Sequence, residues 1–187
     1  MKNLATTLPG VVLVEPDVYG DPRGRFMETY RQDRYAALGI ASKLSFVQDN
    51  FSTSQRGTLR GLHYQLKCPQ GKLVWVTRGS VWDVAVDIRV GSSTFGQSFG
   101  TTLSTDSLRQ LWIPPGFAHG FLVLSDVADF VYKTTAYYVP EDERSILWND
   151  PELAIPWPLS DCGTLTLSAR DRAAPRIFEA DLPSFGP

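Results

Sequence analysis

The sequence has little of the residues that form disulfides, bind metals or cross membranes. Of its 187 residues, only two are cysteine and two are histidine. Cys68 and Cys162 lie far apart with no C-x-x-C spacing, which favours free thiols in a reducing compartment over a disulfide framework. No apolar run approaches the roughly 18 residues that a membrane span needs, and the first ten residues lack the apolar centre of a signal peptide. These absences predict a soluble, cytoplasmic protein with no membrane partner.

The sequence also lacks an excess of charge of either sign. Its formal net charge is −2, from 18 Lys and Arg residues against 20 Asp and Glu residues. Both signs are scattered along the chain, so no basic face indicates a nucleic-acid partner. With 43% hydrophobic residues, a chain of 187 residues can bury a core without disulfides, which predicts one domain over residues 1–187.

Glycine and proline interrupt the chain every few residues, and the segments between them are rich in β-branched and aromatic residues. There are 15 glycines and 13 prolines. This spacing is typical of an all-β sandwich or barrel. Strands are expected over residues 11–16, 26–30, 45–52, 58–66, 72–78, 81–89, 101–104, 108–113, 121–124 and 128–138. A helical turn is expected over 33–38, and a closing helix or loop over 168–179.

Alternation with a period of two predicts which side chains share a face of each strand. It places Gln48, Asn50 and Ser52 on one side of their strand. Strict alternation would turn Arg60 and His63 to opposite faces. Gly61 between them is typical of a β-bulge, which would bring both side chains to one cavity.

The two histidines are the first candidates for proton transfer, because imidazole has an unperturbed pKa of about 6.5. A lone histidine is more often a hydrogen-bonded core residue, but the Arg, Tyr and Gln around His63 favour a functional role. His119 follows a Pro-Gly turn, and for it a catalytic role and an ordinary loop position are equally balanced interpretations.

A catalytic metal is disfavoured by the spacing of these residues. Non-haem iron oxygenases use two histidines and a carboxylate, typically beginning with an H-x-D/E pair. His63 is followed by Tyr64 and Gln65, so that pair is missing. A three-histidine site cannot be built from two histidines. We therefore expect acid–base chemistry with no metal ligands.

Tyrosine and lysine are the remaining candidates for such chemistry. Tyr132 and Tyr138 are an even number of residues apart in the strand expected over 128–138, which places them on one face. Packing with a hydrogen-bonded hydroxyl is the alternative for any one of the seven tyrosines. Lys72 faces inward only if it shares a face with Val74 and Val76, and most lysines at strand starts are solvated.

Several longer motifs follow one another in a fixed order. They are Asp21-x-Arg23-Gly24-x-Phe26, Gln48-Asp49-Asn50, Arg60-Gly61-Leu62-His63-Tyr64-Gln65, Gln70-Gly71-Lys72-Leu73-Val74, Asp83-Val84-Ala85-Val86-Asp87-Ile88-Arg89 and Pro114-x-Gly116-x-x-His119-Gly120-Phe121. In this order the chain resembles the dTDP-4-dehydrorhamnose 3,5-epimerase family from about residue 10 to about residue 172. The resemblance implies an all-β, cupin-type jelly-roll barrel of antiparallel strands with short helical segments near the termini, working as a homodimer.

The resemblance also implies an activity. The family inverts C3 and C5 of dTDP-4-dehydro-6-deoxy-D-glucose, giving dTDP-4-dehydro-L-rhamnose for dTDP-L-rhamnose biosynthesis, without a cofactor. Both carbons flank the C4 ketone, so loss of either hydrogen gives an enolate. His63 matches the family's base, Tyr132 its proton donor and Asp171 the carboxylate that holds the base. Lys72 matches the cation beside O4.

The resemblance extends to residues that bind the substrate. Arg23 and Arg60 match positions that meet the diphosphate, and the Arg23 segment would reach in from the neighbouring subunit. The further matching positions are Phe26, Glu28, Gln48, Asp49, Asn50, His119, Tyr138, Glu143 and Arg170. Core packing is an equal alternative for Phe26 and Tyr138, and Asp83 is expected near His119. The family usually has lysine at position 170, so arginine keeps the charge and changes the geometry.

Three other functions compete with this interpretation. A close relative that inverts only one carbon would share His63, Tyr132 and Asp171. A metal-dependent cupin oxygenase would require stoichiometric iron. A non-catalytic module would bind a sugar nucleotide without turnover.

Overall fold

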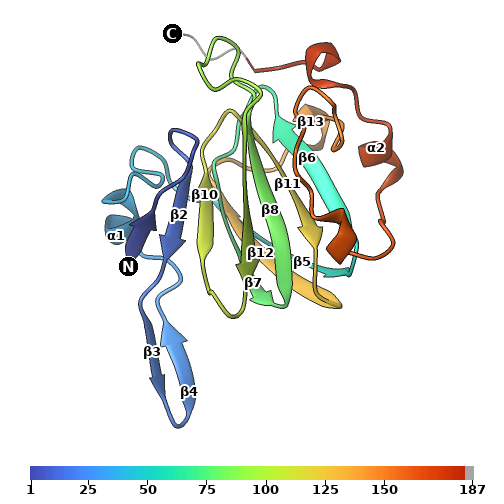
Figure 1. Cartoon of the computed structure of the whole chain (residues 1–187). Coiled ribbons are helices and arrows are strands. Elements are labelled where there is room, and N and C mark those ends of the chain that lie inside the picture. The colour runs from blue at the N-terminus through green and yellow to red at the C-terminus, as the bar shows by residue number, and fades with distance from the viewer. Residues whose placement is uncertain (184–187) are drawn as a thin grey trace.

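The computed structural model describes residues 1–183, whose strands form two facing antiparallel sheets and a separate hairpin (Figure 1). In spatial order, the larger sheet contains β1 (Lys2–Leu4), β2 (Val12–Glu15), β10 (Gln110–Ile113), β7 (Lys72–Arg78), β12 (Val127–Thr134) and β5 (Gln48–Gln55). The smaller sheet contains β13 (Glu143–Ser145), β6 (Leu59–Gln65), β11 (Phe117–Val123), β8 (Ser80–Asp87) and β9 (Ser98–Ser104). From β5 to β13 the chain passes between the sheets at almost every connection, as in a jelly roll. The prediction of an antiparallel all-β barrel is confirmed.

The helices are short and lie near the ends of the chain. They are α1 (Gln32–Ala36), η1 (Pro140–Asp142), η2 (Leu159–Asp161), α2 (Ala169–Arg172) and η3 (Ile177–Glu179). The helical turn expected over 33–38 corresponds to α1, and the segment 168–179 contains α2 and η3. No helix among the described residues is long and apolar enough to cross a membrane.

Apolar side chains pack between the sheets and also cover both outer faces. Val74, Leu111 and Phe130 belong to the inner cluster. The outer face of the smaller sheet packs against the C-terminal segment, and the N-terminal segment around α1 covers part of the larger sheet (Figure 1). Burying one such Val, Leu or Phe side chain contributes roughly 1.5–3 kcal/mol. This packing makes the two sheets rigid walls for a site between them.

The hairpin of β3 (Val18–Asp21) and β4 (Gly24–Met27) projects away from both sheets (Figure 1). Its base is attached to α1 through Arg34, whose guanidinium is 3.1 Å from the carboxylates of both Asp17 and Glu28. Tyr19 and Phe26 on the hairpin are 64% and 71% exposed. An arm that carries large apolar side chains therefore extends into solvent.

Some strand boundaries differ from those expected. β11 begins at Phe117, so His119 lies within a strand, and β12 ends at Thr134, so Tyr138 lies in the loop that follows. The N–H of Tyr138 donates to the side chain of Gln48 at 2.9 Å instead of to a neighbouring strand. β9 begins at Ser98, three residues before the strand expected over 101–104. The shared strand face proposed for Tyr132 and Tyr138 was therefore wrong.

Candidate active site

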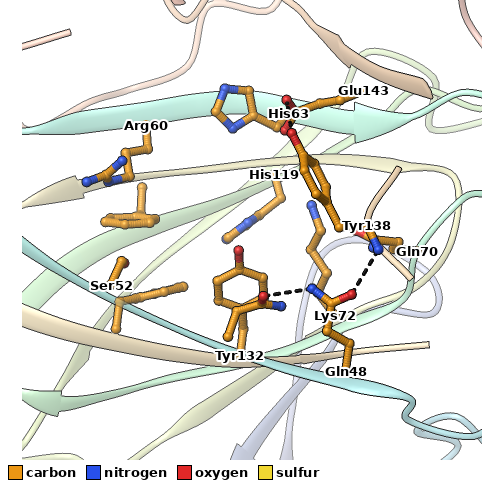
Figure 2. Close-up of a pocket in the computed structure, with 13 residues that line it drawn as sticks. Gln48, Ser52, Arg60, His63, Gln70, Lys72, His119, Tyr132, Tyr138 and Glu143 are labelled. Atoms are coloured by element: carbon orange, nitrogen blue, oxygen red, sulfur yellow. Dashed lines mark hydrogen bonds between the residues drawn. The ribbon is translucent and has the colours of Figure 1, made fainter. Parts of the chain in front are cut away.

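A cavity of about 380 Å³ lies between the sheets and gathers most of the side chains that the sequence suggests for the site. The larger sheet contributes β5, β7 and β12, and the smaller sheet contributes β6, β11 and β13 (Figure 2). The predicted residues that line it are Gln48, Asn50, Arg60, His63, Lys72, His119, Tyr132, Tyr138 and Glu143. A molecule bound in this cavity would meet side chains from both sheets.

His63 and Asp171 form a hydrogen-bonded pair at one wall. Nε2 of His63, in β6, is 2.6 Å from Oδ1 of Asp171, in α2. The Asp171 N–H donates to the side chain of Ser168 at the start of α2, which fixes the position of the carboxyl group. Burial alone would raise the pKa of Asp171, but the hydrogen bond from His63 holds it below the usual value. The ionised carboxylate therefore accepts the Nε2 proton and leaves Nδ1 of His63 free to accept another.

Gly61 allows Arg60 and His63 to face the same cavity. The pairing of β6 with β11 is irregular at this point. Gly61 has φ +124°, and a Cβ there would lie 2.6 Å from the Cα of Gly120. Only glycine fits this position. The irregularity replaces strict alternation, as the sequence predicts, and both side chains line the cavity.

Tyr132 lies on the wall opposite His63, in β12 of the larger sheet (Figure 2). Its ring packs near that of Phe130, with 6.1 Å between the centroids. Burial, followed by the negative charge of Glu143, raises the pKa of Tyr132 above its ordinary value. The phenol therefore keeps its proton at neutral pH and can donate it into the cavity.

Lys72 begins β7 and shares a face of that strand with Val74 and Val76, which belong to the core between the sheets. Its side chain accordingly lines the cavity. Burial lowers the pKa of Lys72 to about 8, while the charges of Glu143 and Asp83 act in the opposite direction. At pH 7 most of the population carries an ammonium group that is poorly solvated and available to a bound anion.

His119 lies in the strand next to His63 and is anchored by a second carboxylate. Its Nε2 is 2.9 and 3.1 Å from the two carboxylate oxygens of Asp83 in β8. Its ring stacks on Phe130 with 6.0 Å between centroids. The interpretation of His119 as a loop residue is therefore wrong. The described residues contain no cluster of three or more His, Cys, Asp and Glu side chains that could hold a metal.

A polar network surrounds the mouth of the cavity. Gln48 donates to Asn50 at 2.8 Å and accepts from the Tyr138 N–H at 2.9 Å. The Tyr138 hydroxyl donates to Glu143 at 3.1 Å. Arg170 is not part of the cavity wall but donates to the Glu143 carboxylate and, at 2.9 Å, to the Glu143 carbonyl oxygen. Its planar guanidinium makes both contacts at once.

Asp49 faces away from the cavity. Its carboxylate lies on the outer surface of the larger sheet, 2.8 Å from Nζ of Lys133. Because Gln48 and Asn50 face inward, alternation turns the residue between them outward. The expectation that Asp49 binds substrate is wrong for the cavity of this chain.

Arg23, Phe26 and Glu28 do not reach the cavity of their own chain either. Arg23 pairs with Asp21 at 2.6 Å on the projecting hairpin, and Phe26 is on the same arm. Glu28 is held at the base of the arm by Arg34. None of the three lines the cavity of its own chain.

Four further side chains line the cavity, and the sequence analysis assigned none of them to the site. They are Ser52, Gln70, Phe121 and Phe130. Alternation already placed Ser52 beside Gln48 and Asn50, and the same rule places Phe130 beside Tyr132. Those two could have been found from the sequence, whereas Gln70 lies in a loop and carries no such signal.

Together these groups equip the cavity to move protons across a bound molecule. An imidazole fixed by a carboxylate faces a protonated phenol on the other wall, and a buried ammonium lies between the sheets with them. On an antiparallel jelly roll, this arrangement defines an acid–base enzyme.

Comparisons with known proteins show to which family of enzymes the chain belongs. Residues 5–179 match the family described as dTDP-4-dehydrorhamnose 3,5-epimerase. The chain is 54% identical over 181 residues to the dTDP-4-dehydrorhamnose 3,5-epimerase of Pseudomonas aeruginosa, covering 97% of this chain and 98% of that one. A dTDP-6-deoxy-D-glucose-3,5-epimerase from Legionella pneumophila, solved with dTDP-4-keto-L-rhamnose, has a TM-score of 0.94 at 52% identity, covering 100% of this chain and 99% of that one. The chain belongs to the dTDP-4-dehydrorhamnose 3,5-epimerase family and is an isomerase, as the sequence motifs predict.

A relative with a narrower activity is also similar. The dTDP-4-dehydrorhamnose 3-epimerase of Streptomyces niveus is 42% identical over 175 residues, covering 92% of this chain and 82% of that protein. This chain is therefore similar both to enzymes named for inversion at two carbons and to one named for inversion at one carbon.

Proposed function

We propose that the chain inverts both C3 and C5 of dTDP-4-dehydro-6-deoxy-D-glucose to form dTDP-4-dehydro-L-rhamnose in dTDP-L-rhamnose biosynthesis. The observation that carries this proposal is the placement of the His63–Asp171 pair and Tyr132 on opposite walls of one cavity. Membership of the family supports the choice of substrate. The reaction needs no cofactor, because the ketone of the substrate activates both carbons.

Each inversion proceeds by removal of a proton from one face of the sugar and delivery of a proton to the other. Nδ1 of His63 accepts the hydrogen of C3 or C5, and the electron pair of the broken C–H bond moves into the C4–O4 enolate. Tyr132 then donates its phenolic proton to the opposite face of that carbon, and the C4 ketone reforms. The imidazolium and the phenolate return to their starting states through solvent. Positioned proton carriers of this kind contribute about 10²- to 10⁴-fold in rate.

Lys72 is proposed to stabilise the charge that develops on O4. An ammonium in a cavity with few competing water molecules interacts strongly with an oxyanion. Its role follows the family position that it matches, and its location between the sheets supports that role.

Turnover should fall as pH rises through about 8. Lys72 carries its charge below its lowered pKa of about 8 and loses the charge above it, so stabilisation of the enolate disappears in alkaline solution. The arginine of a Lys72→Arg variant stays charged over this range. The kcat of the variant should be lower than that of the wild type but should not decline as pH rises. The measurement is kcat from about pH 6 to about pH 9.5. The same alkaline decline in both proteins would assign it to another group.

The nucleotide is proposed to lie along the mouth of the cavity. Arg60 inside the cavity and Arg23 from the hairpin would bind the diphosphate, since guanidinium groups match pairs of phosphate oxygens. Tyr138 at the mouth is 46% exposed and offers a ring for stacking on the thymine. Further substrate contacts are proposed for Phe26, Glu28, Gln48, Asn50, His119, Glu143 and Arg170.

A homodimer is proposed because the hairpin cannot complete the site of its own chain. Arg23 lies on an arm that leaves the body of the protein, and the neighbouring Tyr19 and Phe26 are mostly exposed. Soluble proteins seldom leave such apolar surface uncovered. A second copy that receives this arm would cover the surface and gain the arginine.

Mixing two inactive variants tests whether the arm acts across subunits. A hybrid of a His63→Ala chain with an Arg23→Ala chain would contain one complete site, made of His63 from one protomer and Arg23 from its partner. We expect chains refolded together to regain turnover that neither variant shows alone. A mixture of His63→Ala with Asp171→Asn chains is the control, because both changes damage the same wall. Activity no greater than the sum of the separate variants would contradict an arm that acts in the partner.

Incubation of the substrate in heavy water tests the proposed function. Deuterium should appear at both C3 and C5 of the product, because each carbon loses one hydrogen and gains another from solvent. Label at one carbon only would instead support the narrower activity of the Streptomyces niveus relative. Label at neither carbon would leave a binding role. Activity abolished by a chelator would revive a metal-dependent reaction.

We also propose that residues 1–187 form one catalytic domain and that the protein is cytoplasmic. Both cysteines are free, with Cys68 exposed and Cys162 buried, which suits a reducing compartment.

A further inference from the structure

Gln65 ends the strand that carries His63, and the mechanism above gives it no role. The residue is only 3% exposed and, within residues 1–183, it is not one of those that line the cavity. A glutamine amide has one acceptor oxygen and a nitrogen with two donors, and a buried amide has to bond them inside the protein. The partners of the Gln65 amide therefore indicate what the residue does.

The Gln65 amide bonds to three backbone groups in the two segments that cross between the sheets at the mouth of the cavity. Its Nε2 donates to the carbonyl oxygens of Cys68 at 2.8 Å and Tyr137 at 3.2 Å. Its Oε1 accepts from the N–H of Val139 at 2.7 Å. Cys68 lies between β6 and β7, whereas Tyr137 and Val139 lie between β12 and β13. One buried side chain thus joins both crossing segments.

The same two segments are bonded to each other before the point where Gln65 acts. The N–H of Thr135 donates to the carbonyl oxygen of Gly71 at 3.0 Å, and the Gly71 N–H donates to the Thr135 hydroxyl at 2.8 Å. Nε2 of Gln70 donates to the carbonyl oxygen of Ala136 at 2.9 Å. Gln65 supplies the next bonds along the chain, at Tyr137 and beyond.

Tyr138 lies between the two backbone groups that Gln65 holds in the second segment. Its own N–H donates to Gln48, which comes from the larger sheet (Figure 2). Two glutamines from opposite sheets therefore fix three consecutive residues, while the Tyr138 side chain remains 46% exposed at the mouth. A ring whose backbone is already fixed does not have to be ordered when a ligand binds, so less affinity is lost to ordering.

We propose that Gln65 is a positioning residue for the nucleotide. By fixing the backbone on both sides of Tyr138, it holds that ring where it can stack on the thymine. Gln65 does not touch the substrate, and no bond forms or breaks at its side chain. It therefore acts on affinity and leaves proton transfer unchanged. This inference rests on the stacking role given to Tyr138 in the proposed function and adds the side chain that prepares it.

The test measures the binding of dTDP to the full chain by titration calorimetry, together with KM and kcat. Gln65→Met keeps the length of the side chain and removes all three hydrogen bonds. We expect the Kd for dTDP and the KM to rise by about three- to tenfold, with kcat changed by less than about threefold. In a chain that also carries Tyr138→Ala, the same substitution should change Kd by less than about twofold, because no ring is left to position.

Asp87→Asn is the matched control for a loss of buried hydrogen bonds. Asp87 is fully buried and fixes a different loop by accepting bonds from Arg89, Ser92 and Thr94. We expect this variant to lower the melting temperature, as Gln65→Met does, and to leave the Kd for dTDP within about twofold of the wild type. Loss of stability alone would therefore not imitate the expected effect.

An unchanged Kd in Gln65→Met, a loss confined to kcat, or equal weakening with and without the Tyr138 ring would each overturn the inference. If Gln65→Met does not fold, Gln65→Glu keeps the oxygen that accepts from Val139 and loses the donor nitrogen. That variant must then weaken dTDP binding only while Tyr138 is present.

Tyr138→Ala alone separates this inference from the proposal beneath it. If that variant binds dTDP as tightly as the wild type, the stacking role of Tyr138 is wrong. A wild-type chain that does not bind dTDP would refute the proposed substrate itself. Weaker binding by Tyr138→Ala together with normal binding by Gln65→Met would refute only the role of Gln65.

Discussion

Replacement of His63 by alanine should lower turnover by about 10²- to 10⁴-fold, because the variant has no group positioned to remove a proton from the sugar. Proton removal precedes every later step, so exchange of deuterium into C3 and C5 should fall with turnover. The measurements are kcat and the rate of label uptake at each carbon. A variant that still exchanges either carbon at a wild-type rate would show that His63 is not its base.

The partner of His63 allows a sharper version of this experiment. The Asp171→Asn variant should lose a large part of the turnover that His63→Ala loses. An amide at position 171 no longer ensures that the imidazole carries its proton on Nε2. The double variant should be no slower than His63→Ala alone, since residues that act as a unit are not additive. An additive loss would mean that Asp171 contributes independently of the imidazole.

Local patterns in the sequence were sufficient for side chains that lie on regular strands. Alternation placed Gln48 and Asn50 on one face, and both line the cavity. The same rule, strictly applied to the following strand, would have separated Arg60 from His63. Gly61 signalled the exception, because a residue without a side chain was needed where two backbones approach closely.

Local patterns failed where a contact depended on distant parts of the chain. The residue pattern extends the strand as far as Tyr138, but in the structure the strand ends at Thr134 and the Tyr138 N–H donates to Gln48. Asp171 is 108 residues from His63, and no spacing rule connects them. That pair was expected only because the chain resembles a known family. The bond between His119 and Asp83 likewise depends on two strands that pair only in the folded sheet.

Replacement of Tyr132 by phenylalanine should separate the two halves of the reaction. The variant lacks the proton donor on the far face of the sugar, so inversion should fall by at least about 10²-fold. His63 can still remove a proton, exchange it with solvent and return deuterium to the face from which it came. Unconverted substrate recovered from heavy water should therefore contain deuterium without a change of configuration. The measurement is NMR of both the recovered substrate and the product.

Tyr137→Phe is the control for the chemical change in that experiment. Tyr137 is 68% exposed and its backbone carbonyl, which the substitution keeps, accepts the bond from Gln65. Its loss of a hydroxyl should leave turnover within about twofold, as is usual for a surface change. Near-normal inversion by Tyr132→Phe would require another donor on that wall. If exchange and inversion instead fall by the same factor, Tyr132 acts in proton removal or in substrate positioning. Only the loss of a donor to the far face would slow inversion while exchange continues.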